Sequence, residues 1–460
     1  MTESWKRRSE DAAPHKGGCR NVVAINAPFI RTGAEVKTKL LGSLVVALML
    51  VALGSSAWAA EPITLRVWSG ASESELAVVQ AIVDEWNAAN PDVQVEATMI
   101  RRAPGQSGEE ALLVALAAGT APDIYTAFQG VAAYELAMQG VLLDLSSLEG
   151  ALAAREALAI LPGDLWLDGM LPIIPWQTEV TMLQYNFDLM SEVGVGTPPR
   201  TYSEFFELAR RLQARNVYAT VLSTSTSWSS RLSDFYLWYI AASQGRTPFA
   251  GGKVNLVDDP AAVAAMEFFY ELHELGYAPR MPQPEFHGDA FVEGHMAVQR
   301  WGQGGIPYFR ENVRFDWVTA SPPVPDDYDG VEPPYAYANT KYAGIVSTTR
   351  HPEEALRFLE FFISEASDQK LLASGRFPYR SDLAANPAFA FFFEEMPEAM
   401  PYALNIAHSV GTDFAPGVQR ALEILSEVFV SSVLKAEKDP HLALVEAQER
   451  IRTHFETLAR

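Results

Sequence analysis

Cysteine is nearly absent from this sequence of 460 residues, since Cys19 is the only one. It lies in an N-terminal segment that we expect to be removed, so the remaining chain would contain no thiol. Such a chain forms no disulfide, uses no cysteine nucleophile and binds no metal through thiolates. It also offers no cysteine at the predicted cleavage site to carry a lipid. We therefore expect a protein that is not a lipoprotein. We also predict no bound metal and no cofactor.

Sequence motifs of the common catalytic classes are also missing. The sequence contains no G-x-S-x-G elbow, no G-x-x-x-x-G-K-[ST] loop and no G-x-G-x-x-G turn. His273 and Glu274 begin like a zinc-protease motif, but position 277 is tyrosine where the second histidine is required. Acidic pairs at 258–259 and 353–354 are typical of charges at helix starts rather than of a catalytic acid and base. The sequence therefore predicts a protein that is not an enzyme.

Basic residues are scarce relative to acidic ones. The chain has 35 Lys and Arg against 57 Asp and Glu, and without residues 1–59 the balance is 27 against 53, or a net charge of −26. A surface this acidic disfavours nucleic acids and anionic membranes as partners. With 48% hydrophobic residues, the chain has ample material for a core.

The N-terminal segment has the pattern of an export signal. Lys37 and Lys39 precede an apolar run of 14 residues at 40–53, and a small-residue cleavage site ends at Ala59. This order is typical of a secretory signal peptide, whereas a membrane anchor needs about 20 apolar residues. We expect residues 1–59 to be a leader that is removed near Ala59, which predicts a periplasmic protein. The long polar stretch before the run suggests that translation starts near Val36.

The remainder alternates between strand and helix patterns. Residues 63–68 alternate as a strand, and apolar residues at 76, 79, 83 and 86 then follow helical spacing. Further amphipathic helices are expected at about 260–275, where Gly276 provides a C-terminal cap, and after Pro352. This alternation predicts an α/β architecture.

Four tryptophans stand outside the apolar core pattern. Trp68, Trp176, Trp228 and Trp301 lie at strand ends or among small and polar residues. Sugars have flat C–H faces ringed by hydroxyls, so a sugar site requires aromatic surfaces edged by polar groups. Each tryptophan could instead fill the core, but the serine and glycine neighbours of Trp228 and Trp301 favour a binding role for these two.

The order of short segments along the chain resembles a known family. The segments are TLRVWSG at 64–70, EWNAANPDVQVE at 85–96, AAGTAPDIY at 117–125, GVLLDLSSL at 140–148, LPIIPWQTEVTMLQYNFDLM at 171–190, FVEGHMAVQRWG at 291–302 and KYAGIVSTTRHPEEALRFLEFF at 341–362. In this order they resemble the extracellular solute-binding proteins of carbohydrate ABC importers, the maltose-binding-protein-like family.

The resemblance implies a type II periplasmic-binding-protein fold with two α/β lobes and a ligand cleft between them. The N-terminal lobe would comprise 60–181 and 341–375, and the C-terminal lobe 182–340 and 376–460. It also implies that the chain captures a mono- to oligosaccharide and delivers it to the permease subunits of an ABC importer, as a monomer.

The predicted ligand-binding residues come from this resemblance together with the aromatic pattern. Glu179 occupies the position of a cleft carboxylate just before the first crossing between lobes. The segment R-W-G at 300–302 departs from the family's G-x-W, which leaves open whether Trp301 or the backbone of 302–305 faces the ligand. The full set is Ser69, Gly70, Phe128, Gln129, Trp176, Glu179, Trp228, Tyr236, Trp301, Gly302, Tyr337 and Arg380.

Two alternatives to a sugar receptor remain open. The same fold serves polyols, glycerol-phosphate esters and other non-sugar solutes, and an arginine in the cleft would favour an anionic ligand. Candidates for that arginine are Arg101, Arg102, Arg300 and Arg380. An exported glycan hydrolase would need two carboxylates about 5–9.5 Å apart across the ligand.

Overall fold

A mixed sheet runs through the described part of the chain. The computed structural model describes residues 61–70, 72–103, 106–148, 169–225 and 227–458, so the predicted leader lies outside the described residues. Within these ranges the strand order is β2-β1-β3-β7-β4-β5, with β6 and β8 paired to β4 and β9 paired to β7. The strands are β1 (Ile63–Ser69), β2 (Val93–Met99), β3 (Ile124–Gln129), β4 (Ile174–Asn186), β5 (Val298–Gly302), β6 (Trp317–Ala320), β7 (Ala336–Ile345), β8 (Phe377–Pro378) and β9 (Ser409–Val410).

The first part of the sheet carries the predicted alternation of strands and helices. Strands β2, β1 and β3 are parallel, and β7 joins β3 in the antiparallel sense. Leu65 and Val67 face a hydrophobic core together with Val79, Val83 and Trp86 of the first helix. This confirms three of the four predicted stripe residues, whereas Leu76 is only half-buried and lies outside this core. The helices around this core are α2 (Glu73–Ala89), α3 (Gly108–Ala117), α4 (Gly130–Met138), η1 (Leu145–Ser147), α11 (Pro352–Phe362) and α12 (Glu365–Ala373).

A second, larger core is built mainly from residues between 180 and 451. Its helix α9 begins at Pro260 behind the Asp259 cap, and Gly276 follows its end with a φ of +74°, as the sequence predicts. The helical segments of this half are α6 (Phe187–Glu192), α7 (Tyr202–Gln213), α8 (Trp228–Ala242), η2 (Ala250–Gly252), α9 (Pro260–Glu274), η3 (Gln303–Gly305), α10 (Ile306–Asn312), η4 (Pro387–Phe389), α13 (Ala390–Glu395), η5 (Pro397–Ala399), α14 (Met400–Asn405), η6 (Ile406–His408), α15 (Val418–Phe429), the π-helical turn η7 (Val430–Leu434) and α16 (Pro440–Leu458).

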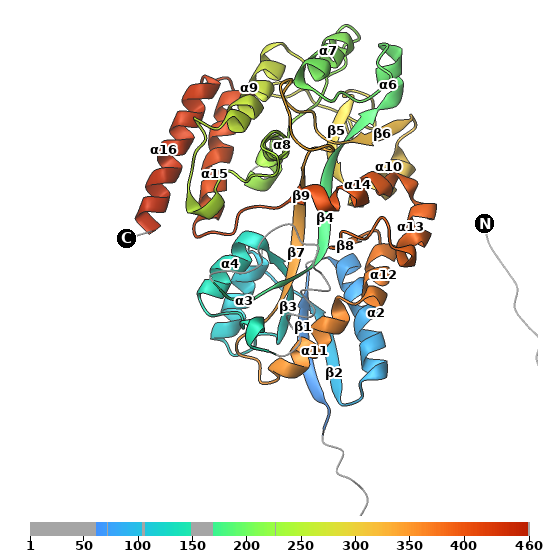
Figure 1. The fold of residues 1–460 in the computed structure, drawn as a ribbon, viewed down its shortest axis with the longest axis vertical. Helices are drawn as coiled ribbons and strands as arrows, with labels where there is room; N and C mark the ends of the chain where they lie inside the picture. Colours follow the sequence, from blue (N-terminus) through green and yellow to red (C-terminus); the bar gives the residue numbers. More distant parts are fainter. Residues whose placement is uncertain (1–60, 71, 104–105, 149–168, 226, 459–460) are drawn as a thin grey trace, which may run out of the picture. The chain divides into compact units, whose positions relative to one another are not determined.

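Strands β4 and β7 connect the two cores. Figure 1 shows them running side by side from one group of helices to the other, and their antiparallel register pairs Thr178 with Thr340 and Thr181 with Tyr337. Val131 of α4 and Leu372 of α12 belong to the larger core, so packing does not follow the chain segments strictly. The architecture is α/β, as predicted, while the residue bounds of the two lobes stay a prediction.

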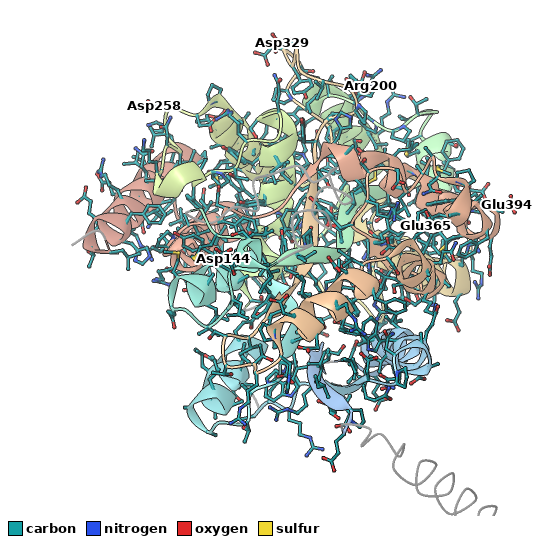
Figure 2. All side chains as sticks on the ribbon, turned by 60° about the horizontal axis from the view of Figure 1, so that its bottom comes forward. Asp144, Arg200, Asp258, Asp329, Glu365 and Glu394 are labelled. Carbon is teal, nitrogen blue, oxygen red and sulfur yellow. The ribbon has the colours of Figure 1, made fainter. Side chains whose placement is uncertain are left out.

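Many of the excess acidic side chains project into solvent. Asp258, Asp329 and Glu394 are exposed, and Figure 2 shows them at the edges of the structure. Within the described ranges, no helix is both long and apolar enough to cross a bilayer.

Candidate functional site

A pocket of about 780 Å³ lies where the two cores approach each other. One wall comes from the smaller core, through the loop after β1, the start of α3 and the end of β3. Strand β7 forms the floor with consecutive residues 337–342, and the starts of α8 and α15 contribute the opposite side. The pocket thus collects residues that are more than 300 positions apart, between Gly70 and Glu423.

Four of the predicted binding residues line this pocket: Gly70, Gln129, Trp228 and Tyr337. Trp228 is the first residue of α8 and is partly exposed. The Tyr337 ring lies on β7 and packs edge-on against Tyr236, with centroids 5.4 Å apart. Tyr125 and Tyr342 also line the pocket, so its lining contains four aromatic residues together with the amides of Gln129 and Asn339.

Three predicted aromatic residues lie in the cores instead, and the predicted Ser69 is also fully buried outside the pocket lining. Phe128 is fully buried with its ring 4.3 Å from that of Tyr125. Trp176 is 3% exposed, donates its indole N–H to the Thr126 carbonyl at 2.7 Å and packs on Phe362. Tyr236 is 2% exposed and lies behind Tyr337. None of these three rings lines the pocket.

Arg380 is committed to an ionic network outside the pocket lining. Its guanidinium bonds to Asp368 at 2.9 Å and to Asp382 at 2.8 Å, and lies over the Phe389 ring. Burial raises the pKa of Asp368, and the Arg380 charge acts against that rise. Arg380 therefore ties α12 to the loop that follows β8.

Glu179 and Gly302 are in contact, at a place separate from the lining of the pocket. A β-carbon built on Gly302 would lie 2.2 Å from Glu179 Oε1, so the carboxylate occupies the space that glycine leaves free. Burial raises the pKa of Glu179, while the charges of Lys341, Arg300 and Arg376 lower it. The carboxylate thus lies in a cationic environment on the crossing strand.

Trp301 packs against aromatic neighbours rather than lining the pocket. Its indole stacks on Tyr308 with centroids 5.8 Å apart and an angle of 22°, and meets Phe309 edge-on. A β-carbon on Gly305 would come within 2.5 Å of the indole. The Glu179 carboxylate thus lies beside Gly302, and the Trp301 indole lies beside Gly305.

Sequence reasoning considered Arg102 but missed the other charged residues of the wall that the smaller core provides. Lys341 lines the pocket and forms an ion pair with Glu75 of α2. Glu109 and Arg102 line it as well, and burial raises the pKa of Glu109 against lowering contributions that include the Gln129 backbone and Arg102. Glu75 and Glu109 both lie in first helical turns. A carboxylate in that position is common because it interacts favourably with the helix dipole, so their position in the sequence did not indicate a binding role.

Carboxylates outnumber cations in the pocket lining. The acidic residues are Glu109, Glu110, Glu135 and Glu423, and the basic ones are Arg102 and Lys341. Of the four arginines considered for an anionic ligand, Arg102 alone lines this pocket. Arg300 instead pairs with Asp234 at 2.9 Å. In the described ranges no group of three or more His, Cys, Asp or Glu side chains is arranged to hold a metal ion.

Known proteins match both the sequence and the fold. The family model for bacterial extracellular solute-binding proteins matches residues 70–369. The maltotriose-binding protein of Pyrococcus abyssi is 23% identical over 333 residues, which cover 70% of this chain and 67% of that protein. The cyclic alpha-maltosyl-1,6-maltose binding protein from Arthrobacter globiformis shares the fold with a TM-score of 0.74 at 18% identity, over 86% of this chain and 100% of that chain.

A further similar structure contains a different kind of ligand. UgpB from Mycobacterium tuberculosis in complex with glycerophosphocholine has a TM-score of 0.67 at 19% identity, over 87% of this chain and 99% of the other. The shared fold is the two-lobe type II periplasmic-binding-protein fold, which confirms the predicted fold class. Because the family model spans most of the chain, this protein belongs to the bacterial extracellular solute-binding proteins of the ABC transporter family.

Proposed function

We propose that the chain is the substrate-binding component of an ABC importer and that it binds a carbohydrate in the 780 Å³ pocket. The observation that carries the proposal is the composition of that pocket. Trp228 and Tyr337 supply aromatic surfaces for the C–H faces of sugar rings, and Gln129 and Asn339 supply amides for the hydroxyls. The name of the Pyrococcus relative, a maltotriose-binding protein, supports the same ligand class.

Ligand capture would couple to a hinge motion between the lobes. We assign 60–181 and 341–375 to the N-terminal lobe, and 182–340 and 376–460 to the C-terminal lobe. Because Gln129 and Trp228 come from different lobes in this division, a sugar that contacts both would hold the lobes together. The closed form would then be the one presented to the permease.

An anionic solute is the second candidate within the binding class. The glycerophosphocholine complex of UgpB favours it, but the four carboxylates against two cations in this pocket act against it. A phosphate ester would meet net repulsion here unless both Arg102 and Lys341 contacted it. We therefore place a neutral sugar ahead of a phosphate ester.

We further propose that the protein does not catalyse a reaction on its ligand. The family consists of binding proteins, and the pocket acids would serve as hydrogen-bond acceptors for hydroxyls. Incubation of the purified protein with the best-bound oligosaccharide, followed by a reducing-sugar assay, tests this directly. Release of reducing ends above a boiled-protein blank would favour the hydrolase.

Export, the cellular location and the association state are proposals as well. The sequence supports a leader cleaved near Ala59 and a monomeric periplasmic protein without a lipid anchor. N-terminal sequencing and intact mass of the protein recovered from the host envelope would test cleavage. A lipid adduct, or a leader that is retained, would contradict it.

The main experiment is a binding screen of the chain from Glu61 onward. Isothermal titration calorimetry would cover glucose, maltose, maltotriose, a cyclic tetrasaccharide, glycerol and glycerophosphocholine. We expect at least one oligosaccharide to bind with a change in tryptophan fluorescence, because Trp228 lines the pocket. Binding of glycerophosphocholine without binding of any sugar would shift the assignment to the second candidate.

A further inference from the structure

Lys341 lies on the β7 segment that forms the pocket floor, where strands β3, β7 and β4 are paired. Its partners in the sheet are Gln129 of β3 and Gln177 of β4. The side chain lines the pocket and keeps 24% of its surface exposed. Lys341 is therefore the only basic residue that strand β7 contributes to the pocket lining.

A buried carboxylate holds the Lys341 ammonium from behind. Glu75 lies in the first turn of α2, its side chain is 4% exposed, and its Oε2 accepts from Lys341 Nζ. Gly70 lines the pocket directly in front of this carboxylate, because a β-carbon there would lie 2.1 Å from Glu75 Oε1. Any other residue at position 70 would displace the carboxylate that positions the lysine.

The hydrogen-bonding capacity of this pair is only partly used. An ammonium has three N–H donors and no acceptor, and one described residue, Glu75, accepts from Lys341. Among the described side chains, Glu75 Oε1 and the nearby Ser69 Oγ are buried without a partner. Buried polar atoms without a partner are uncommon in folded proteins. These two lie next to Gly70 of the pocket lining, where a ligand or ordered water can complete them.

Stability alone gives a poor reason for such a pair. Desolvation of two buried charges can cost as much as their attraction returns, and apolar replacements are often neutral. A charge pair at a pocket surface contributes to binding when a ligand oxygen accepts hydrogen bonds from the remaining N–H groups, because hydrogen bonds that involve a charged group are stronger than neutral ones. The placement of the pair thus favours recognition over stabilisation.

We propose that Lys341 is a specificity-determining residue that donates hydrogen bonds to one oxygen-bearing position of the bound sugar, and that Glu75 is its positioning residue. This inference rests on the proposed function and names one contact within it. A site built to hydrogen-bond a particular hydroxyl rejects the analogue that lacks it. The position contacted by Lys341 therefore fixes which end or face of the sugar enters the floor of the pocket.

The test combines variants of the protein with sugar analogues that each lack one hydroxyl group. The probe is maltotriose with its monodeoxy analogues, or the tightest sugar of the screen and its analogues if that sugar differs. Because Lys341→Met alone leaves the Glu75 charge unpaired, the main variant is the double substitution Lys341→Met/Glu75→Gln. The matched control is Lys370→Met, which breaks an ion pair with Glu85 that also joins α2 to a neighbour but lies outside the pocket lining.

In the wild type we expect one deoxy position to weaken binding by at least tenfold. The double variant should bind the parent sugar at least tenfold more weakly than the wild type does. Its affinity for the analogue that lacks that same hydroxyl should then be less than twofold lower than its affinity for the parent sugar. Penalties at the other positions persist in the double variant, and Lys370→Met reproduces the whole wild-type series. Circular dichroism and melting confirm that each variant is folded.

Unchanged affinity and an unchanged deoxy pattern in a folded double variant would overturn the inference and leave the sugar assignment intact. If the double variant binds the parent sugar and every deoxy analogue more weakly by the same factor, the pair has a structural role and makes no contact with one particular hydroxyl. That result would also overturn the inference. A wild-type protein that binds no sugar of the screen would instead remove the proposed function, and the ligand role of Lys341 with it.

Discussion

Phe414 packs edge-on against Tyr342 of the crossing strand, with ring centroids 5.7 Å apart and an angle of 79°. The same ring lies over Gly130, where a β-carbon would come within 2.9 Å of it. Phe414 follows β9 in the chain, yet it packs on the smaller core, whereas Val131 of α4 packs into the larger one. Side chains from each half therefore interlock next to the pocket.

The first prediction concerns this interlock. Phe414→Ala removes a partly buried ring from the contact with Tyr342, and we expect it to lower the free energy of unfolding by about 1–3 kcal/mol. Urea denaturation followed by circular dichroism measures the change. Phe391→Ala is the matched control, because Phe391 is 44% exposed, and its effect should stay within about 0.5 kcal/mol. Equal losses in the two variants would show that the interlock contributes no stability of its own.

The second prediction separates the two tryptophans favoured by the sequence. Trp228 lines the pocket, whereas the Trp301 indole stacks on Tyr308. We expect Trp228→Ala to weaken sugar binding by about 2 kcal/mol, or roughly 30-fold in Kd, because aromatic anchors in a pocket carry much of the binding energy. Titration calorimetry of Trp228→Ala and Trp301→Ala side by side gives the answer. A loss confined to Trp301→Ala would place the ligand against β5 instead of α8.

The third prediction tests the contact between Gly302 and Glu179. A methyl group at 302 would lie 2.2 Å from the carboxylate, so Gly302→Ala must displace a partly buried acid, at a cost of about 1–3 kcal/mol in stability. Gly304→Ala is the control, because its β-carbon would meet the same acid at an ordinary 3.5 Å. In a Glu179→Ala background the Gly302→Ala penalty should shrink. If the penalty is unchanged there, Glu179 is not what the methyl group displaces.

The sequence predicted the architecture well because periodicity and caps are local signals. The helix stripe at Val79, Val83 and Trp86, the proline start of α11 and the cap at Gly276 all depend on neighbours a few residues away. The family resemblance was recognised for the same reason, because each of its segments is a short local sequence. Such local features can be identified without knowledge of the contacts that the rest of the chain makes.

The site was less predictable because it is assembled from distant segments. Phe128 and Gln129 are adjacent, but side chains alternate between the two faces of a strand. The Phe128 ring therefore lies in the core, and the Gln129 side chain lies at the pocket. The sequence could not show that Lys341 would meet Glu75, which lies 266 positions away. An isolated lysine in a strand and an acid in a first helical turn each have an ordinary local explanation, and only the fold brings them together.

The last prediction concerns pH and the buried acid Asp413. Burial raises its pKa from 3.8 to about 6, although hydrogen bonds from the Thr247 hydroxyl and the Phe249 N–H act in the opposite direction. The folded state therefore holds this proton up to a higher pH than the unfolded state does. Between about pH 4 and pH 6 the folded state binds more protons, so this group makes stability fall as pH rises through that window.

Asp413→Asn cannot lose a proton, and its stability should lack this contribution. The free energy of unfolding of the variant minus that of the wild type should therefore rise between pH 4 and pH 6.5, by about 1–3 kcal/mol. A constant offset from the altered hydrogen bonds leaves the slope of that difference unaffected. Urea denaturation at half-unit pH steps measures it, with Asp258→Asn at an exposed site as the control for a general charge effect. A difference that stays flat for Asp413→Asn, or that rises equally for both variants, would show that Asp413 is ionised in the folded protein throughout this range.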